Sequence, residues 1–255
     1  EQERFLTVSV HKKNVDEART FFSRVTGEIT SKLSRLNSSS NELDAAERLD
    51  VLRGFFRPEE AALPFDLQSA MRRGHNLKDT ICPDSLEFHR DYFKMGSQYG
   101  RVLFLKDYAS YIKDSMILEL TDLNRRMMLS IDMIPVPTDE AVREVENKLL
   151  GVETNVTNWQ RRQNSNQNFS AVVPYDLEQQ RKETREMLDD LTTRDQRMLF
   201  AVVTLVHLAD SKEELDSDTE TLQSIARKHL CQLAKLSFQQ QDGLITALPL
   251  GLRRI

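Results

Sequence analysis

Apolar residues recur at two spacings along this chain, and the change from one to the other predicts strands and helices in turn. Residues 5–10 alternate and are rich in β-branched side chains, so they predict a strand. Asn14 and Glu17 then offer a capping box to a helix. The apolar stripe of this helix is Val15, Ala18, Phe22, Val25, Ile29, Leu33 and Leu36. A second helix is expected from about residue 42 to residue 56.

The middle of the chain predicts a long connection followed by a hairpin. Residues 57–83 hold three of the seven prolines and little periodicity, which is typical of a long and often functional connection. The elements expected after it are two strands joined through Gly96 and Gly100, a helix and a third strand, at residues 86–93, 101–105, 107–123 and 127–134.

The strictest apolar stripe belongs to a helix that Thr138 is expected to cap. Its members recur with a 3-4-3-4-3 spacing and are Val142, Val145, Leu149, Val152, Val156 and Trp159. Such a stripe is typical of helix hairpins and short coiled coils. A charged helix at about 175–191 follows, so the pair predicts an αα-hairpin over 138–193. The stripe is therefore either the packing seam of this hairpin or a surface for a partner protein or a second copy.

The last third predicts a strand, a helix, a returning strand and a short helix, at residues 198–208, 211–229, 231–238 and 239–248. Ser211 and Glu214 offer a second capping box. The whole pattern predicts an α+β fold, with mixed sheets that contain ferredoxin-like βαβ pieces and a long αα-hairpin. An N-terminal α/β part, residues 1–83, is expected to precede an α+β module, residues 84–255.

Composition narrows the possible functions. The net charge is −5, with basic residues scattered among acidic ones, so a dedicated nucleic-acid surface is not expected. No apolar run approaches the roughly 20 residues that span a bilayer. Two cysteines do not make a disulfide framework and indicate a reducing compartment.

The residue patterns of common active sites are missing. A phosphate-binding P-loop needs a Gly-Lys pair, and the chain contains none. The five histidines share no zinc-ligand spacing, and nothing near Cys82 would activate its thiol. Residues 99–104 only superficially resemble an RNA-binding strand and predict a half-buried strand with Tyr99 at its edge. We therefore predict no catalytic, cofactor-binding or metal-binding residue. The alternative is a small enzyme or nucleotide-binding domain with an atypical site near residues 57–83 and Asp210.

Several segments together resemble a known family in their order and spacing. They are Arg4-Phe5, Ala18–Phe22, Glu47–Leu49, Lys78–Pro83, Tyr99–Phe104, Ser130–Pro135 and the C-terminal run from Leu236 to Gly251. They resemble the N-terminal module of the ATPases of conjugation and type IV secretion machines, the CagE/TrbE/VirB family, in the form found in Gram-positive conjugative elements.

This resemblance implies a non-catalytic part of a larger motor protein. Such ATPases are cytoplasmic, peripheral to the membrane and hexameric, and ATP and Mg²⁺ bind in a domain that these residues do not include. The module is implied to dock on channel components at the inner membrane and to support self-association. The residues expected to link it to the motor domain are Gln241, Asp242, Gly243, Leu248, Pro249, Leu250 and Gly251. No cofactor and no direct nucleic-acid binding are expected for this chain.

Overall fold

The computed structural model describes residues 3–58, 66–74, 76–109, 111–166 and 172–255. The chain forms two compact units, residues 1–130 together with 203–255, and residues 131–202. This division differs from the expected boundary between residues 83 and 84, which falls inside the first unit. The predicted hairpin segment, 138–193, lies within the second unit.

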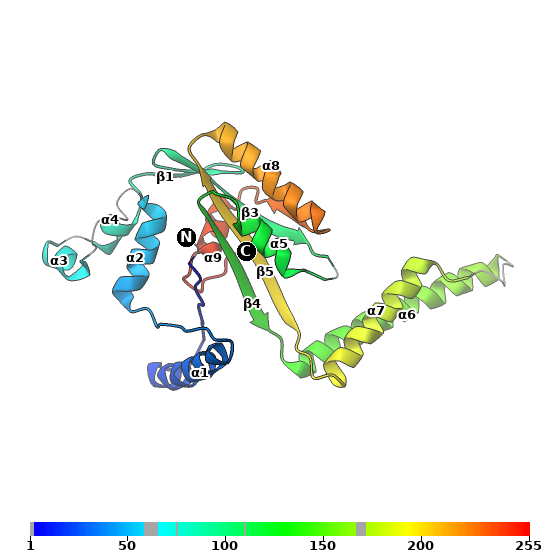
Figure 1. Ribbon diagram of the computed structural model, residues 1–255. Coiled ribbons are helices and arrows are strands. Elements are labelled where there is room, and N and C mark those ends of the chain that lie inside the picture. The colour runs from blue at the N-terminus through cyan, green and yellow to red at the C-terminus, as the bar shows by residue number, and fades with distance from the viewer. Residues whose placement is uncertain (1–2, 59–65, 75, 110, 167–171) are drawn as a thin grey trace. The chain divides into compact units, whose positions relative to one another are not determined.

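One antiparallel sheet organises the first unit (Figure 1). The strands in the described part of the chain are β1 Leu86–Phe88, β2 Phe93–Met95, β3 Gln98–Asp107, β4 Met127–Pro135, β5 Leu199–Ala209 and β6 Gln232–Lys235. Strand β3 pairs with β2 and β6 along one side and with β5 along the other, always antiparallel. Backbone bonds from Leu208 to Arg126 and from Val136 to Met198 give β5 and β4 the same antiparallel sense. The expected mixed sheet was therefore wrong.

The connections between the strands define the fold. Helix α5, Asp114–Thr121, joins β3 to β4, and helix α8, Lys212–Lys228, joins β5 to β6. The spatial order β4-β5-β3-β6 places a strand of one βαβ unit between the two strands of the other. This is the order of the ferredoxin-like βαββαβ fold, so the α+β class and the predicted βαβ pieces are confirmed.

Both faces of the sheet are covered. On one face, Leu103 and Leu205 pack against Met116 of α5 and Leu222 of α8. On the other, Val102 packs with hydrophobic residues of β2, β5 and helix α9, Gln240–Ala247. Because both faces are covered at the centre of the sheet, the central strands are mostly apolar rather than alternating. This explains why apolar residues occupy successive positions of β5, interrupted only by Thr204 and His207.

The N-terminal residues form helices but not the strand that was expected before them. In the described residues, the helices that precede the sheet are α1 Val15–Arg35, α2 Ala45–Phe56, α3 Leu67–Arg72 and α4 Leu77–Ile81. Residues 5–10 form no strand, and Phe5 and Leu6 are exposed. The predicted strand was wrong because an alternating pattern needs a sheet edge to pair with, and this segment has no ladder partner in the described part of the chain. The long connection at 57–83 contains the two short helices α3 and α4, and residues 59–65 lie outside the described residues.

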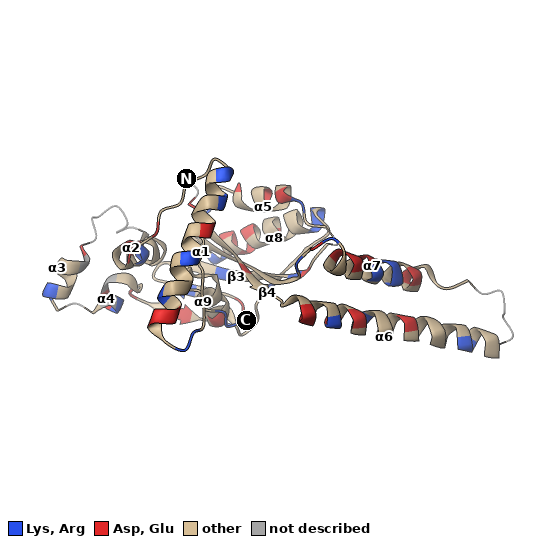
Figure 2. Ribbon diagram, turned by 90° about the horizontal axis from the view of Figure 1, so that it is seen from below, with Lys and Arg blue, Asp and Glu red and all other residues tan. Residues whose placement is uncertain are grey.

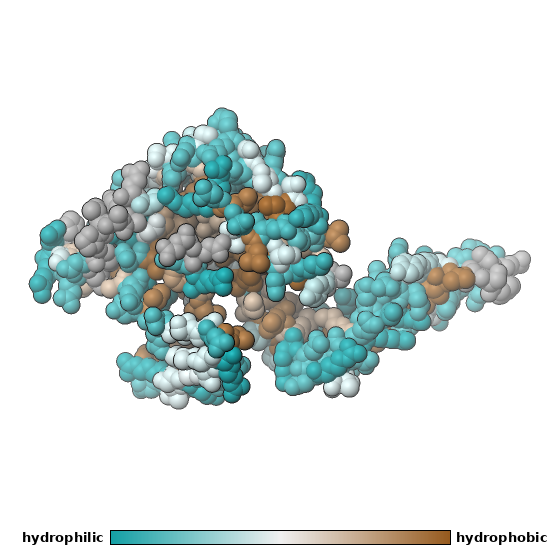
Figure 3. Space-filling model, viewed as in Figure 1, coloured by the Kyte–Doolittle hydropathy of each residue, from teal (hydrophilic) through white to brown (hydrophobic). Residues whose placement is uncertain are grey.

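The second unit contains the predicted helix pair, α6 Thr138–Ser165 and α7 Tyr175–Thr192. Acidic and basic residues follow both helices along their length, and their outer surface is mostly hydrophilic (Figures 2 and 3). The αα-hairpin is confirmed. The expected cap at its start was wrong, because Thr138 is the first helical residue and its hydroxyl accepts a hydrogen bond from Arg197 instead.

Candidate functional site

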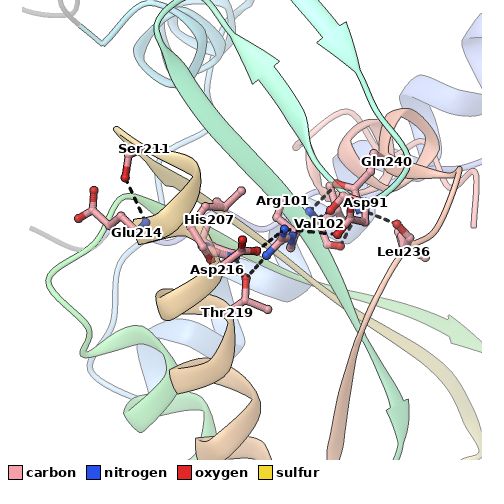
Figure 4. A network of polar contacts seen from close by, with 11 residues as sticks. Asp91, Arg101, Val102, His207, Ser211, Glu214, Asp216, Thr219, Leu236 and Gln240 are labelled. Carbon is pink, nitrogen blue, oxygen red and sulfur yellow. Dashed lines mark hydrogen bonds and ion pairs between the residues drawn. The ribbon is translucent and has the colours of Figure 1, made fainter.

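The most unusual chemistry of the chain is a buried polar network around Arg101, in the middle of β3 (Figure 4). The Arg101 side chain is 1% exposed, and its Nη2 lies 2.8 Å from Oδ1 of Asp216 on α8. The same guanidinium donates from Nε to the backbone carbonyl of Asp91, 2.9 Å away, and from Nη1 to the Thr219 hydroxyl, 2.7 Å away. A buried guanidinium needs such partners, because burying a charge without them is strongly unfavourable.

Thr219 connects Arg101 to His207 of β5 through hydrogen bonds. Its hydroxyl donates to the carbonyl of Leu215, one turn earlier on α8, at 2.7 Å. The same oxygen lies 3.1 Å from Nε2 of His207. A hydroxyl has one proton to donate, so Nε2 of His207 must be the protonated nitrogen and the donor. Its Nδ1 is buried and has no hydrogen-bond partner among the described residues.

The charges of this network are fixed over the neutral pH range. Burial, the positive charge of Arg101 and that of Lys235 lower the pKa of His207 to about 4, so its imidazole is neutral. Hydrogen bonding to Arg101 lowers the pKa of Asp216, so its carboxylate is ionised. The ionised pair and the neutral histidine tie β3, β5 and α8 together. His207 and Thr219 are both fully buried, so this part of the network stabilises the fold.

The protein is expected to lose stability as the pH falls from about 6.5 to 4. In this window an unfolded His207, with an ordinary pKa near 6.5, binds a proton that the folded residue does not accept. The unfolded state therefore binds more protons, and the free energy of unfolding falls by up to about 3 kcal/mol across the window. Urea denaturation at several pH values measures this, and His207→Gln is expected to flatten the profile between pH 4 and 6.5. An unchanged slope in that variant would assign the pH dependence to other groups.

The C-terminal run that carries part of the family resemblance packs onto β3. Val102 lies between the stretches of β3 that pair with β2 and β6. The side-chain amide of Gln240 fills this gap: its Oε1 accepts from the Val102 N–H at 2.8 Å, and its Nε2 donates to the Val102 carbonyl at 3.2 Å. Nε2 also donates to the carbonyl of Leu236 at 2.7 Å. Gln240 thus takes the place of a strand at this position.

The residues expected to form a link to a motor domain have structural contacts inside the first unit. A Cβ on Gly243 would collide with Leu236 and lie 2.8 Å from Cγ1 of Val102, so only glycine lets α9 approach the sheet. Leu248 is buried, whereas Gln241 and Leu250 are exposed.

The end of this run is held by N-terminal residues. The Pro249 carbonyl accepts from Nη2 of Arg48 on α2 at 3.1 Å, and the Gly251 carbonyl accepts from the Ser9 hydroxyl at 3.3 Å. The carbonyl of Asp242 accepts from Thr246 within α9. Segments from both ends of the sequence therefore meet over one surface of the first unit.

The apolar stripe of α6 is the seam of the helix pair. Val145, Val152 and Val156 are buried, and Val142, Leu149 and Trp159 are half-buried. Glu153, on the same helix, forms an ion pair with Arg185 of α7, with 2.6 Å between Oε1 and Nη2. The three buried valines are thus part of the intramolecular seam, the first of the two alternatives that the sequence left open. Leu150, next to the stripe, is 68% exposed.

The alternative site near residues 57–83 and Asp210 is not assembled as a catalytic centre in the described residues. A shallow depression of about 230 Å³ lies between Arg57, Asp84 and the β2–β3 turn. Arg57 is occupied there by the carbonyls of Asp79 and Cys82 and by the Asp84 carboxylate. Asp210 does not line the depression; it is exposed and accepts from the Gln98 amide at 3.3 Å.

Possible metal ligands, membrane-spanning helices and related proteins give no further indication of function. No group of His, Cys, Asp and Glu in the described ranges could hold a metal ion. None of the helices that the structure describes is long and apolar enough to cross a membrane. Comparison of the sequence with protein-family models and with curated proteins finds no match.

Proposed function

We propose that this chain is a non-catalytic interaction and assembly module of a conjugative type IV secretion ATPase. It docks the motor on channel components at the inner face of the cell membrane and supports oligomerisation of the motor for DNA or protein transfer. Nucleotide chemistry belongs to another domain of the parent protein. The module is cytoplasmic and peripheral to the membrane.

The observation that carries this proposal is that three of the family-like segments belong to one sheet or pack on it. Tyr99–Phe104 forms the centre of β3, and the C-terminal run packs on it through Gln240 and Gly243. Ser130–Pro135 belongs to β4 of the same sheet. Segments that are far apart in the sequence but are tertiary partners behave as parts of one module. This supports the resemblance that rests on their order and spacing.

The way in which the buried polar side chains are bonded also favours a module without catalytic activity. Arg101, Asp216, Thr219 and His207 bond to one another and hold strands to a helix, and Arg57 holds a loop. A hydrolytic site would instead aim such groups into a cavity that admits its substrate.

A nucleotide titration tests the proposal. Isothermal titration of the purified chain with ATP and Mg²⁺ is expected to give no binding at micromolar concentrations, and a phosphate-release assay is expected to show no turnover. Micromolar binding or turnover would overturn the proposal and support the alternative of a nucleotide-binding domain. In a second experiment, the purified chain is expected to bind inner-membrane channel proteins encoded beside it. Failure to bind any of these proteins would also contradict the proposal.

A further inference from the structure

A row of aromatic rings and cations lies on the hairpins that open the sheet. The rings of His89 and Tyr92 stack, with centroids 4.4 Å apart and planes at 15°. The ring of Tyr99 on β3 follows at 6.1 Å from that of Tyr92. Lys94 is directly opposite Tyr99 in the β2–β3 register, with its Nζ 5.7 Å from that ring, and Nζ of Lys212 lies 5.5 Å from the Tyr92 ring. We call these five residues the aromatic–cation row.

Within the described residues, the cations of this row have ring contacts but no ion pair. Lys94 and Lys212 form no ion pair with a carboxylate among the described residues, and neither does Arg90 on the adjacent turn, whose guanidinium lies 5.5 Å from the Phe238 ring. Of the nearby carboxylates, Asp91 and Asp216 pair with Arg101. Glu87 lies 3.9 Å from His89 and directly opposite Lys94 in the β1–β2 register, so it offsets part of the Lys94 charge. The positive charge of Lys212 helps to lower the pKa of Asp216, and the Asp216 carboxylate in turn offsets part of the Lys212 charge. Positive charge thus remains beside the ring faces.

Rings flanked by unpaired cations suit a ligand that is both flat and anionic. Single-stranded nucleic acids present bases that stack on aromatic side chains and phosphates that attract lysine and arginine. His89 and Lys212 are exposed, whereas Tyr92, Lys94 and Tyr99 are half-buried, so the accessible part of the row is centred on His89 and Lys212. We propose that the aromatic–cation row binds single-stranded nucleic acid without sequence preference.

Folding creates this feature from residues that the sequence keeps apart. The overall charge of −5 argues against a broad nucleic-acid-binding surface, and only the short aromatic–cation row is proposed to bind. The row instead gathers residues from the β1–β2 turn, β2, β3 and the start of α8 into a short strip. A strip of this size spans few nucleotides, so the affinity is expected to be modest and to fall steeply with salt. The proposal does not depend on the proposed function, because it requires no motor domain and no channel component.

The test is fluorescence anisotropy with a labelled oligothymidylate of about 12 nucleotides. The intact chain is expected to bind it at low ionic strength and to bind a duplex of the same length more weakly, because paired bases cannot stack on the rings. Tyr92→Leu is expected to weaken binding about tenfold, the usual effect of losing one stacked base. Lys94→Gln is expected to reduce the slope of log affinity against log salt by about 1.

Matched controls separate this strip from general attraction to any tyrosine or lysine. Tyr175 and Lys182 on α7 are both exposed and lie outside the row, so Tyr175→Leu and Lys182→Gln are expected to leave the affinity unchanged. Because Lys94 is a surface charge, Lys94→Gln keeps the proposal testable even where Tyr92→Leu fails to fold. No binding by the intact chain at low salt, equal binding of the duplex, or equal losses in row and control variants would each overturn the proposal.

Discussion

Arg101→Met is expected to lower the free energy of unfolding by about 4 kcal/mol, as is typical when one partner of a buried ion pair is removed. The substitution keeps an unbranched side chain in the β3 position but leaves the Asp91 carbonyl without its donor, and His207 is then the remaining donor to the Thr219 hydroxyl. Asp216 loses its cation as well, and its 45% exposure lets water take over that part of the pairing. Urea denaturation at pH 7 measures the loss.

The control for this variant is the same substitution at a surface arginine. Arg143 on α6 is 68% exposed and lies 3.9 Å from Asp139 one turn earlier. Such exposed pairs contribute between roughly 0 and 1 kcal/mol, so Arg143→Met is expected to change the free energy of unfolding by less than about 1 kcal/mol. Equal effects at Arg101 and Arg143 would show that the buried network does not hold the sheet to α8.

Gln240→Leu is expected to be about as damaging, at about 4 kcal/mol. Leucine fills a similar volume, but it leaves the Val102 N–H and the Leu236 carbonyl without the partner that Gln240 supplies. The Val102 carbonyl keeps its hydrogen bond from the Leu236 N–H, at 3.3 Å. A buried backbone group that loses its partner costs about 1–3 kcal/mol, and two such groups are affected. Chemical denaturation gives the size of the effect, and amide hydrogen exchange at Val102 is expected to accelerate more than exchange elsewhere in β3.

The neighbouring glutamine provides the control for Gln240. Gln241 carries the same amide one residue later, but it is exposed. Gln241→Leu is therefore expected to change stability by less than about 0.5 kcal/mol. A large loss at Gln241, or a small one at Gln240, would contradict the role of the Gln240 amide as a substitute strand.

Periodicity predicted the packed elements and also α1, which has no buried residue, but it failed for a strand that needs a distant pairing edge. The stripe of α6 and the apolar run of β5 were identified correctly because burial sets their spacing. Residues 5–10 show the same alternation but no strand, since pairing depends on a distant edge that a local pattern does not contain. The register and antiparallel sense of the sheet were also beyond the sequence, because they depend on which strands become neighbours.

The candidate sites were harder to predict than the elements. Arg101 offered one usable signal, because a charged residue in the middle of an apolar strand must find partners when both faces are covered. Gln240 offered none: it is the second of three consecutive glutamines, and only the tertiary gap beside Val102 distinguishes it. The aromatic–cation row likewise brings His89 and Tyr92 of the β1–β2 turn together with Lys212 of α8, which is more than 100 residues away in the sequence.

The position of the helix pair in the topology has a consequence for how such chains can vary. Strands β4 and β5 are antiparallel neighbours, and a short turn is enough to join such a pair. The α6–α7 segment is therefore an insertion at a hairpin, and every strand of the ferredoxin-like sheet lies in sequence before or after it. Its length can change by whole helical turns without altering a single strand pairing, so the helix pair and the sheet are free to evolve separately.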